Sequence, residues 1–440
     1  MTTTMGKPKA TRKEIWAWYL YDFGNSAYAA VVLLAVYSAY FKGSVVGGAE
    51  GTRLWGYAVG IAMLVVAVTA PILGALADYS GSKKKFLLFY TAMAIIFTGG
   101  LFFAEAGDVA IGMGFFILAE IGYRSAQVFY NSLLPEIATQ EEMGRISGNG
   151  WAIGTAGGIL ALFIILPMIV IFESDPFVIR LSMVITAVFF ALSAAPIFLW
   201  LPERAEKRSL PPGENYLSLS NKQFMEAFRK VSRFKEFLKF VVAFLVYNDG
   251  VITALNFAAI IGAVLFGMNQ TDLIIFVIIV QVTTAAGAYV FGEIVDRWSG
   301  KRSLLLSIAV ICIAIIWMYF NETQLGFYLI GSLAGFGMAG AQSVSRTMVG
   351  MFAPEGQSAQ FYGFFAVAGR SSSFIGPTIY GIIAAEAALS YERSGLSQIA
   401  AEQQGQRLAI LSILVFLVIG AGLLLFWVNE KKAKEMALAG

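Results

Sequence analysis

Long apolar runs recur along the whole chain, and short polar or charged segments separate them. A helix needs about 20 mostly apolar residues to cross the roughly 30 Å of hydrocarbon in a bilayer. Backbone polar groups in lipid must be paired within their own segment, so each run is expected to be an α-helix. The runs that are long enough are 16–41, 54–77, 86–104, 110–134, 148–172, 178–201, 236–266, 272–295, 303–320, 325–349, 359–385 and 407–428. The pattern therefore predicts an all-α membrane protein with twelve transmembrane helices.

The composition supports this interpretation, because too much of the chain is apolar for a soluble fold. Hydrophobic residues make up 58% of the 440 residues, charged residues make up 13%, and the mean hydropathy is +0.72. Ordinary soluble domains are about 45–50% apolar. The excess apolar surface is therefore expected to face lipid. The net charge of +3 and the lack of a basic stripe give no reason to expect a nucleic-acid partner.

Basic residues are concentrated in every second connecting segment. Lysines or arginines precede the first run, follow the second at 83–85, fill the polar stretch after the sixth, and follow the last at 431–434. The opposite set of segments holds little beyond Lys42, Arg53, Arg393 and Arg407. Because basic segments tend to stay on the cytoplasmic side, both termini are predicted to be cytoplasmic.

The longest interior polar stretch divides the runs into six and six. It contains the turn-forming sequence PPGEN at 211–215 and then an amphipathic run, NKQFMEAFRKVSRFKEFLKF. Such a run is expected to lie as a helix on the membrane surface. The predicted organisation is a six-helix bundle at 1–201, a cytoplasmic linker with an amphipathic helix at 202–235, and a second six-helix bundle at 236–440.

The two halves carry matching sequence features. GALADYSGSKKK follows the second run and GEIVDRWSGKRS follows the eighth, so each half has Gly-x3-Asp before a basic cluster. Gly74 and Gly292 are expected to let helices approach closely. Asp78 and Asp296 are predicted to pair with neighbouring cations in a cytoplasmic gate, where Arg346 would tie a loop to its helix. Such repeats are typical of transporters whose halves rock against each other.

The fourth run carries a polar stripe. Its members lie at i, i+4, i+7 and i+11, on one narrow helical face; they are Glu120, Arg124, Gln127 and Asn131. A charge in the middle of a bilayer costs at least about 2.5–3.5 kcal/mol, so these residues need a reason to be there. One alternative is an ion pair within the helix, Glu120 with Arg124, that only neutralises itself. The other is the wall of a water-filled cavity, which also explains the two amides.

Three other runs carry stripes of similar spacing. They are Asp22 and Asn25 after Trp18 in the first run, Asp249, Thr253 and Asn256 in the seventh, and Gln342, Ser345 and Arg346 in the tenth. In the eleventh run Arg370 has no carboxylate within one turn. It therefore needs a partner from another helix, a lipid headgroup or an anionic solute. Together the stripes predict one wet interface shared by runs one, four, seven and ten.

Several longer strings carry a family resemblance. They are YDFGNSAY at 21–28, YNSLLPEIA at 130–138, GRISGNGWAIGTAGG at 144–158, YNDGVIT at 247–253, QSVSRTM at 342–348 and FYGFFAVAGRSSSFIGP at 361–377. With the paired Gly-x3-Asp loops, they resemble the major facilitator superfamily and its vacuole-effluxer-like branch over nearly the whole chain. The resemblance implies two pseudo-symmetric six-helix bundles whose first, fourth, seventh and tenth helices line a central cavity. Fungal members of that branch export amino acids from the vacuole, and most bacterial members have no assigned substrate.

These observations lead us to expect a secondary transporter for a small polar solute, an amino acid before others, with export favoured by the resemblance. A zwitterion needs a cationic and an anionic contact. Arg124 could meet the carboxylate as a bidentate fork, and Asp22 or Asp249 could meet the ammonium group. The predicted solute contacts are Asp22, Asn25, Arg124, Gln127, Asn131, Asp249, Asn256 and Arg370. Because the chain has no histidine, proton coupling would fall to Asp22, Glu120 or Asp249.

The sequence gives no reason to expect an enzyme or a cofactor. It has no phosphate-binding loop of the Gly-x4-Gly-Lys type and no His/Cys cluster for a metal. The main alternative is a multidrug or organic-anion exporter on the same fold. A non-transporting membrane receptor or an embedded enzyme agrees less well with the sequence. The expected partners are the solute and the lipid bilayer, with the chain as a monomer. The expected location is the plasma membrane of a bacterium, or a vacuolar or other organelle membrane of a eukaryote.

Overall fold

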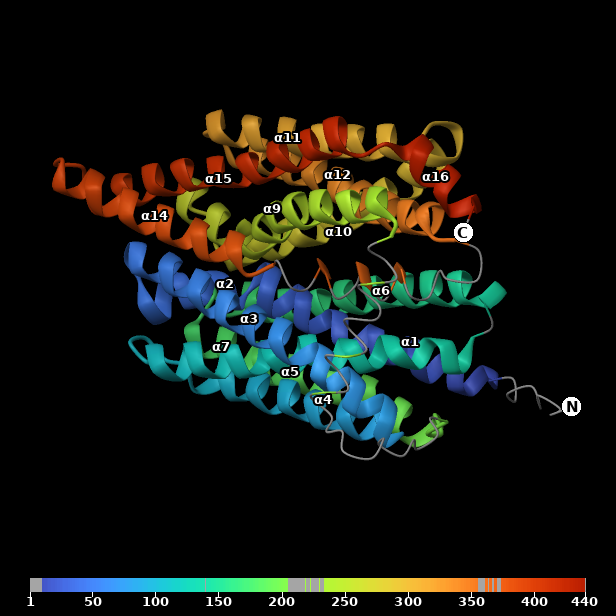
Figure 1. Cartoon of the computed structure of the whole chain (residues 1–440). Helices are drawn as coiled ribbons and strands as arrows, with labels where there is room; N and C mark the ends of the chain where they lie inside the picture. The colour runs from blue at the N-terminus through green and yellow to red at the C-terminus, as the bar shows by residue number, and fades with distance from the viewer. Residues whose placement is uncertain are drawn as a thin grey trace, which may run out of the picture.

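The computed structural model describes residues 10–138, 140–204, 218, 222, 229, 233–354, 361–362, 364–365, 368–369 and 373–439. Within these residues the regular elements are helices, and the long ones run side by side (Figure 1). The first half contains α1 (Arg12–Tyr28), η1 (Ala29–Ala35), α2 (Tyr37–Tyr40), η2 (Phe41–Val46), α3 (Gly48–Ser80), α4 (Lys83–Gly100), η3 (Leu101–Phe103), α5 (Val109–Ile137), α6 (Gln140–Ile171) and α7 (Pro176–Trp200). The second half contains α9 (Lys235–Phe266), α10 (Gln270–Arg297), α11 (Gly300–Phe320), α12 (Gln324–Phe352), α14 (Ile375–Arg393), α15 (Gln398–Trp427) and α16 (Glu430–Ala439).

In the described part of the chain, 10 helices are long and apolar enough to cross a membrane. Helix α12, with 29 residues, and helix α14, with 19, are not among them. The polar side chains of Gln342 and Arg346 lower the hydropathy of α12, and much of the predicted run before α14 lies outside the described residues. The prediction of an all-α membrane protein is confirmed, and the number of twelve spans stays a prediction.

The helices extend beyond the apolar runs from which they were predicted. The predicted run 54–77 lies within α3, which continues until Gly81 adopts a left-handed conformation with φ 57°. Helix α10 begins at a capping box, in which Asp272 N donates to Asn269 Oδ1 at 3.0 Å and Asn269 N donates to Asp272 Oδ2 at 3.1 Å. Hydropathy detects only the lipid-compatible part of a helix, whereas these local contacts decide where the helix ends.

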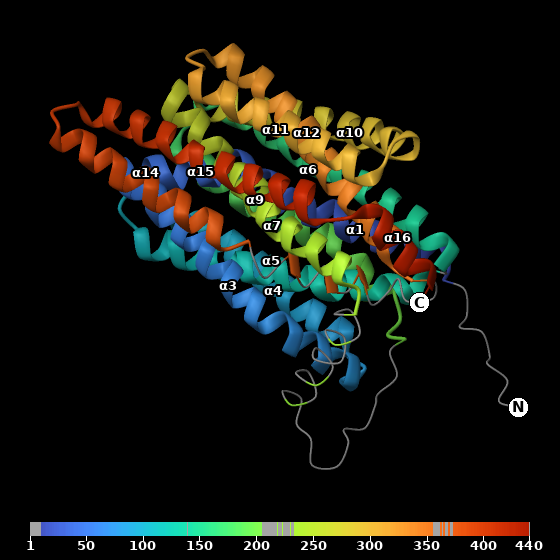
Figure 2. The ribbon, with the colours of Figure 1, turned by 45° about the horizontal axis from the view of Figure 1, so that its top comes forward.

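The helices of each half pack mainly against one another. Helix α1 packs against α6 and α7 and α4 against α5, while α9 packs against α15 and α10 against α12. Figure 1 shows the first half below the second, and Figure 2 shows the long helices side by side from another direction. The predicted linker at 202–235, with its amphipathic helix, falls mostly outside the described residues.

The two ends of the helix bundle are distinct. The start of α1 and the whole of α16 lie at one end, which we call the terminal end (Figure 1). The turn between α14 and α15 lies at the other, which we call the far end. All later positions along the bundle refer to these two ends.

Each half is tied together at the terminal end by the same device. In the first half Lys84 N donates to Glu203 Oε2 at 2.9 Å, and Lys84 Nζ donates to carbonyl groups at the end of α7. In the second half Lys301 N donates to Glu430 Oε2 at 2.9 Å, and Lys301 Nζ donates to Leu425 O at 2.8 Å. In both cases a lysine at the start of the third long helix of a half (α4 or α11) binds the end of the sixth long helix (α7 or α15).

Candidate functional site

The polar stripe on α5 becomes steadily more exposed toward the terminal end. The side chain of Glu120 is fully buried, that of Arg124 is 23% exposed, Gln127 is half-buried and Asn131 is exposed. Arg124 Nε donates to Glu120 Oε1 at 2.7 Å, so the predicted ion pair within the helix does form. The pair leaves the two terminal nitrogens of the Arg124 guanidinium without a described partner. The stripe therefore combines an ion pair at its base with polar groups that reach water toward the terminal end.

Helix α1 faces the base of this stripe. Tyr28 of α1 stacks on Tyr123 of α5, with ring centroids 4.5 Å apart, and the Arg124 guanidinium lies 5.2 Å from the Tyr123 ring centroid. The buried Tyr28 hydroxyl and the Glu120 carboxylate interact with each other. Neither the hydroxyl nor Glu120 Oε2, however, makes a hydrogen bond of normal geometry to a described residue. Unpaired polar atoms are unusual in a protein interior, which marks this spot as a place for a water, a proton or a solute group.

About two turns nearer the terminal end, three aromatic rings join α1 to α5. Trp18 stacks on Tyr130 with centroids 4.5 Å apart, and Tyr130 stacks on Tyr21 at 4.9 Å. Trp18 Nε1 donates to Tyr130 O and the Tyr130 hydroxyl donates to Trp18 O, both at 3.2 Å. All three rings are buried. Because the rings cover one another, they hold the two helices together and offer little free surface for stacking a solute.

The predicted site residues on α9 are deeply buried. Asp249 is 2% exposed and its Oδ2 accepts from Gly376 N at 2.8 Å, in the first turn of α14. Its Oδ1 has no hydrogen-bond partner among the described residues. Asn256 accepts from Trp55 Nε1 through its backbone oxygen at 2.9 Å, while its side-chain Nδ2 is unpaired within the described chain. The stripe on α9 therefore lies along the seam with α14, where Asp249 caps the helix.

On α12 two members of the stripe bind α9 and the third does not. Gln342 Nε2 donates to Asn248 Oδ1 at 2.8 Å, and the hydroxyls of Ser345 and Tyr247 are 2.6 Å apart. Arg346 is exposed, and no ion pair to a described residue is formed by its guanidinium. The Arg346 guanidinium interacts electrostatically with the Asp22 carboxylate on α1, in the other half.

The far end is sealed by contacts between the halves. The ion pairs are Lys42–Glu402 at 2.5 Å and Arg53–Glu386 at 2.9 Å; the hydrogen bonds run from Gln406 Nε2 to Thr52 Oγ1 at 2.9 Å and from Gln270 Nε2 to Val36 O at 3.2 Å. Helix α3 packs closely on α14. Gly56 allows this approach, because any side chain there would place its Cβ only 2.5 Å from Pro377 O. No pattern in the sequence singled out these residues for a site. The only signal was an isolated basic residue, Lys42 or Arg53, beside otherwise weakly charged connections.

The predicted gate at the terminal end is described only in part. The surroundings of Gly74 and the side chains of Asp78 and Asp296 lie outside what the structure describes, and so does all of Arg370. No described atom lies within 4 Å of where a Cβ on Gly292 would be, so this glycine does not provide the close helix contact expected of it. The backbone of Arg346 does tie two segments together, because Tyr362 donates its hydroxyl to Arg346 O at 3.0 Å.

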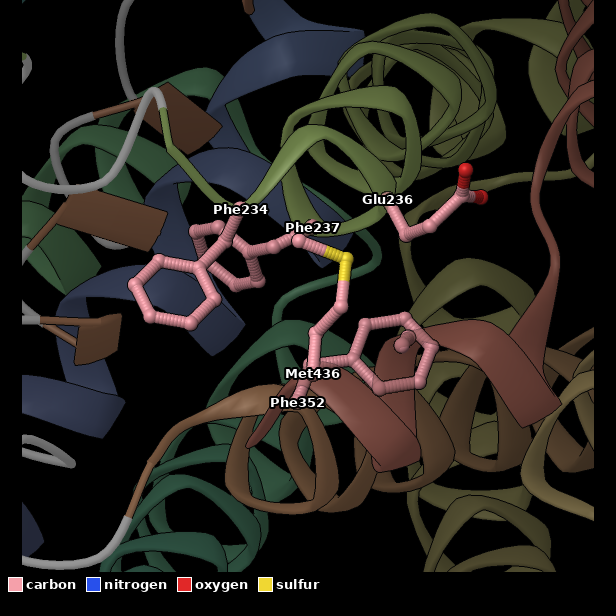
Figure 3. Close-up of a pocket in the computed structure, with 6 residues that line it drawn as sticks. Phe234, Glu236, Phe237, Phe352 and Met436 are labelled. Atoms are coloured by element: carbon pink, nitrogen blue, oxygen red, sulfur yellow. The ribbon is translucent and has the colours of Figure 1, made fainter. Parts of the chain in front are cut away.

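An apolar pocket at the terminal end is filled by the packing of side chains from three helices. Phe234 and Phe237 from the start of α9, Phe352 from the end of α12 and Met436 from α16 meet there beside Glu236 (Figure 3). The side chains leave no space for a water-sized molecule. This pocket therefore anchors α16 to the second half and does not hold a solute.

This chain is similar in sequence and in fold to known proteins. A family model described as "Vacuole effluxer Atg22 like" matches residues 54–438. The chain is 27% identical over 432 residues to the uncharacterized MFS-type transporter YxiO of Bacillus subtilis, covering 96% of each chain. It is 22% identical to autophagy-related protein 22 of Yarrowia lipolytica, covering 54% of this chain and 45% of that one.

Solved transporter structures have the same fold. A bacterial homolog of the human lysosomal transporter Spinster, inward-facing and unoccupied, superposes with a TM-score of 0.73 at 15% identity, covering 97% of this chain and 98% of that one. The D-xylose-proton symporter gives 0.65 at 14% identity, covering 96% and 98%. The matched proteins are transporters and not enzymes.

Proposed function

Because the chain belongs to the vacuole effluxer Atg22-like family of major-facilitator transporters, we propose that it moves a small polar solute, an amino acid before others, by alternating access. Export is the favoured direction. An amino-acid substrate agrees with the charges of both signs on α1, α5 and α12, since a zwitterion needs one contact of each sign. The chain itself is an integral membrane protein, in the plasma membrane if its source is bacterial.

The observation that supports this proposal best is the difference between the two ends of the bundle. Ion pairs and close helix packing join the halves at the far end. Toward the terminal end, the α5 stripe passes from the buried Glu120 to the exposed Asn131. Contacts that close one end, together with polar groups that become exposed toward the other, are what one state of an alternating-access carrier requires.

We also propose that the chain has twelve spans, with bundles at 1–201 and 236–440 joined by the linker at 202–235. With both termini in the cytoplasm, the far end faces the other side of the membrane, and the proposed path opens toward the cytoplasm. The basic residues gathered in the terminal-end connections support this orientation.

The proposed solute contacts are those that the sequence suggested: Asp22, Asn25, Arg124, Gln127, Asn131, Asp249, Asn256 and Arg370. Arg124 offers its two terminal nitrogens, and Asp22 offers a carboxylate that is not fully buried. Asp22, Glu120 and Asp249 are the candidates for carrying a proton with the solute. Glu120 and Asp249 each keep one buried oxygen without a partner in the described chain, which supports their candidacy.

Uptake into proteoliposomes tests the proposal. Purified protein is reconstituted, and radiolabelled L-amino acids are offered singly, with protein-free liposomes as the blank. We expect saturable uptake of at least one amino acid, reduced about tenfold or more in Arg124→Gln, since a hydrogen bond to a charged group contributes about 1.5–3 kcal/mol. The matched control is Arg393→Gln, an exposed arginine at the end of α14. Transport of hydrophobic dyes without any amino-acid flux would replace this proposal with a multidrug exporter.

A further inference from the structure

Three consecutive lysines begin α4, and the described residues bind the side chains of only two of them. Lys83 Nζ forms an ion pair with Glu136 Oε1 at 2.9 Å. Lys84 Nζ donates to carbonyl groups at the end of α7, and its backbone N–H donates to Glu203 Oε2. Lys85 is exposed, and no ion pair joins its ammonium group to a described residue. The start of α4 therefore carries a positive charge that the described part of the chain does not neutralise.

Lys85 stands at the end of an apolar face that α4 turns toward the membrane. Phe89, Ile96 and Phe103 follow it on the same side of the helix, and they are 62%, 65% and 62% exposed. Only 28% of the most apolar part of this span is buried inside the protein. Helix α4 also lies on the side of the first half that faces away from the second (Figure 1). Lys85 is therefore placed where a lysine can lay its stem on an apolar surface and reach the lipid headgroups.

A cavity of about 490 Å³ lies beside Lys85. The described residues that line it all come from the start of α4: Ser82, Lys85, Phe86, Phe89 and Tyr90. The rings of Phe86 and Tyr90 stack on Phe129 of α5, with centroids 5.3 Å and 5.8 Å away, so packing fixes this wall of the cavity. Pockets for small ligands have volumes of about 300–1,000 Å³, so the cavity has room for a headgroup and part of an acyl chain.

The cation and the aromatic wall together limit the class of ligand. A soluble anion needs Lys85 but gains little from exposed phenyl rings, and a hydrocarbon chain needs the rings but not the charge. A phospholipid carries a phosphate at the headgroup level and acyl chains below it. Because no described carboxylate balances the charge of Lys85, a lipid with net negative charge complements the site better than a zwitterionic lipid does.

We propose that the start of α4 binds an anionic phospholipid, with its phosphate at Lys85 and one acyl chain along Phe89 and Ile96. The lipid belongs to the leaflet at the terminal end. Its headgroup lies next to Lys84, which joins α4 to the end of α7, so a bound lipid adds a contact where two helices of the first half meet. The site is on the outer surface of the first half and does not depend on which solute is carried.

Native mass spectrometry of the full chain, purified in detergent, tests the site. Dioleoyl-phosphatidylglycerol is titrated against the protein, with dioleoyl-phosphatidylcholine as the neutral lipid of equal chain length. A basic residue near an anionic lipid surface contributes about 1 kcal/mol, which is about fivefold in affinity. We therefore expect the wild type to bind its first phosphatidylglycerol at least about fivefold more tightly than its first phosphatidylcholine.

Variants separate the charge from the apolar wall. Lys85→Gln should remove the preference for phosphatidylglycerol, and Lys85→Arg should keep it. Phe89→Ala should weaken the binding of both lipids several-fold, because it removes apolar surface from the wall.

The matched control is Arg302→Gln. Arg302 is exposed and follows Lys301 at the start of α11, just as Lys85 follows Lys84 at the start of α4. The substitution removes the same charge, but Ser303 and Leu306 stand where α4 has Phe86 and Phe89. We expect the preference for phosphatidylglycerol to be unchanged in this variant.

Three results would overturn the site. One is equal binding of the two lipids by the wild type, which needs no variant to fold. Another is an equal loss of preference in Lys85→Gln and Arg302→Gln, which would indicate a general attraction between anionic lipid and the basic end of the bundle. The third is displacement of phosphatidylglycerol by glycerol phosphate at the same concentration as the lipid, which would assign the site to a soluble phosphate. Because no readout uses transport, each of these results leaves the proposed function standing.

Discussion

At the scale of single residues, the charges between the halves are of two kinds. Glu120 and Arg124 neutralise each other on one helix, at 2.7 Å, so their pairing does not depend on how the halves are placed. Asp22 and Arg346 belong to different halves, so the distance between them changes whenever the halves move. We therefore expect the Glu120–Arg124 pair to stabilise the fold in every state, with the two terminal nitrogens of Arg124 still available to the solute, and the Asp22–Arg346 interaction to differ between states.

Glu120→Gln tests the structural pair. The substitution keeps the shape of the side chain but leaves Arg124 without its counterion, and breaking a buried pair is strongly destabilising. We expect the thermal unfolding midpoint of the purified protein to fall by several degrees. The matched control is Glu293→Gln, which breaks an exposed pair of the same i,i+4 spacing with Arg297 on α10; an exposed pair contributes only about 0–1 kcal/mol. Equal effects of the two variants would refute a buried structural pair.

Glu430, outside the membrane-spanning helices, gives a pH dependence. Burial alone would raise the pKa of this carboxyl, but the ammonium group of Lys434 and the backbone N–H of Lys301 outweigh burial and hold its pKa below the ordinary 4.5. A carboxyl with a lowered folded pKa stabilises the fold above its unfolded pKa and loses that effect as the pH falls through the folded one.

We therefore expect the stability gap between wild type and Glu430→Gln to be full near neutral pH and to shrink below about pH 4.5. Thermal unfolding at a series of pH values measures it. Glu435→Gln, at an exposed position on the same helix, is the control and is expected to show little gap at any pH. A gap for Glu430→Gln that stayed constant down to pH 3 would contradict the assignment.

At the scale of elements, the structure distinguishes contacts that hold each half together from contacts that join the halves. The hydrogen bonds of Lys84 and Lys301 bind α4 to the end of α7 and α11 to the end of α15. The ion pairs of Lys42 and Arg53 join α3 and the segment before it to α14 and α15. If the halves move as rigid bodies, the first kind persists through the cycle and only the second kind breaks.

Breaking the far-end seal is expected to expose residues behind it. Val36 is fully buried, and its oxygen accepts from Gln270 across the interface. We introduce Val36→Cys in a Cys312→Ser background, which removes the single native cysteine. A membrane-impermeant maleimide applied to intact cells should label this cysteine several-fold faster once Lys42→Gln and Glu402→Gln are added.

The control for this labelling is Arg180→Gln. It breaks the ion pair with Glu105, which also lies at the far end but stays within the first half. The labelling rate should not change in this variant. Acceleration in the control, or none in the double variant, would mean that the cross-half pairs do not seal the far end.

At the scale of the whole molecule, the sequence predicted the fold far better than the site. Apolar runs and polar stripes follow from local spacing, so the helices and the α5 stripe were predictable. The far-end seal was not, because Lys42 and Glu402 are separated by 360 positions and no local pattern joins them. Asp249 shows the same limit: helical spacing suggested a solute contact, whereas its contact with Gly376 depends on how α14 packs.

The central claim is that two halves alternate around a bound solute, and paired distance measurements test it most directly. In the Cys312→Ser background, spin labels are placed at the exposed Lys85 and Arg302 for the terminal end, and in a second sample at Phe177 and Leu325 for the far end. The account predicts that a transported amino acid shortens the terminal-end distance and lengthens the far-end distance. Distances that stay unchanged at both ends with the amino acid bound, or that change in the same direction, would contradict it.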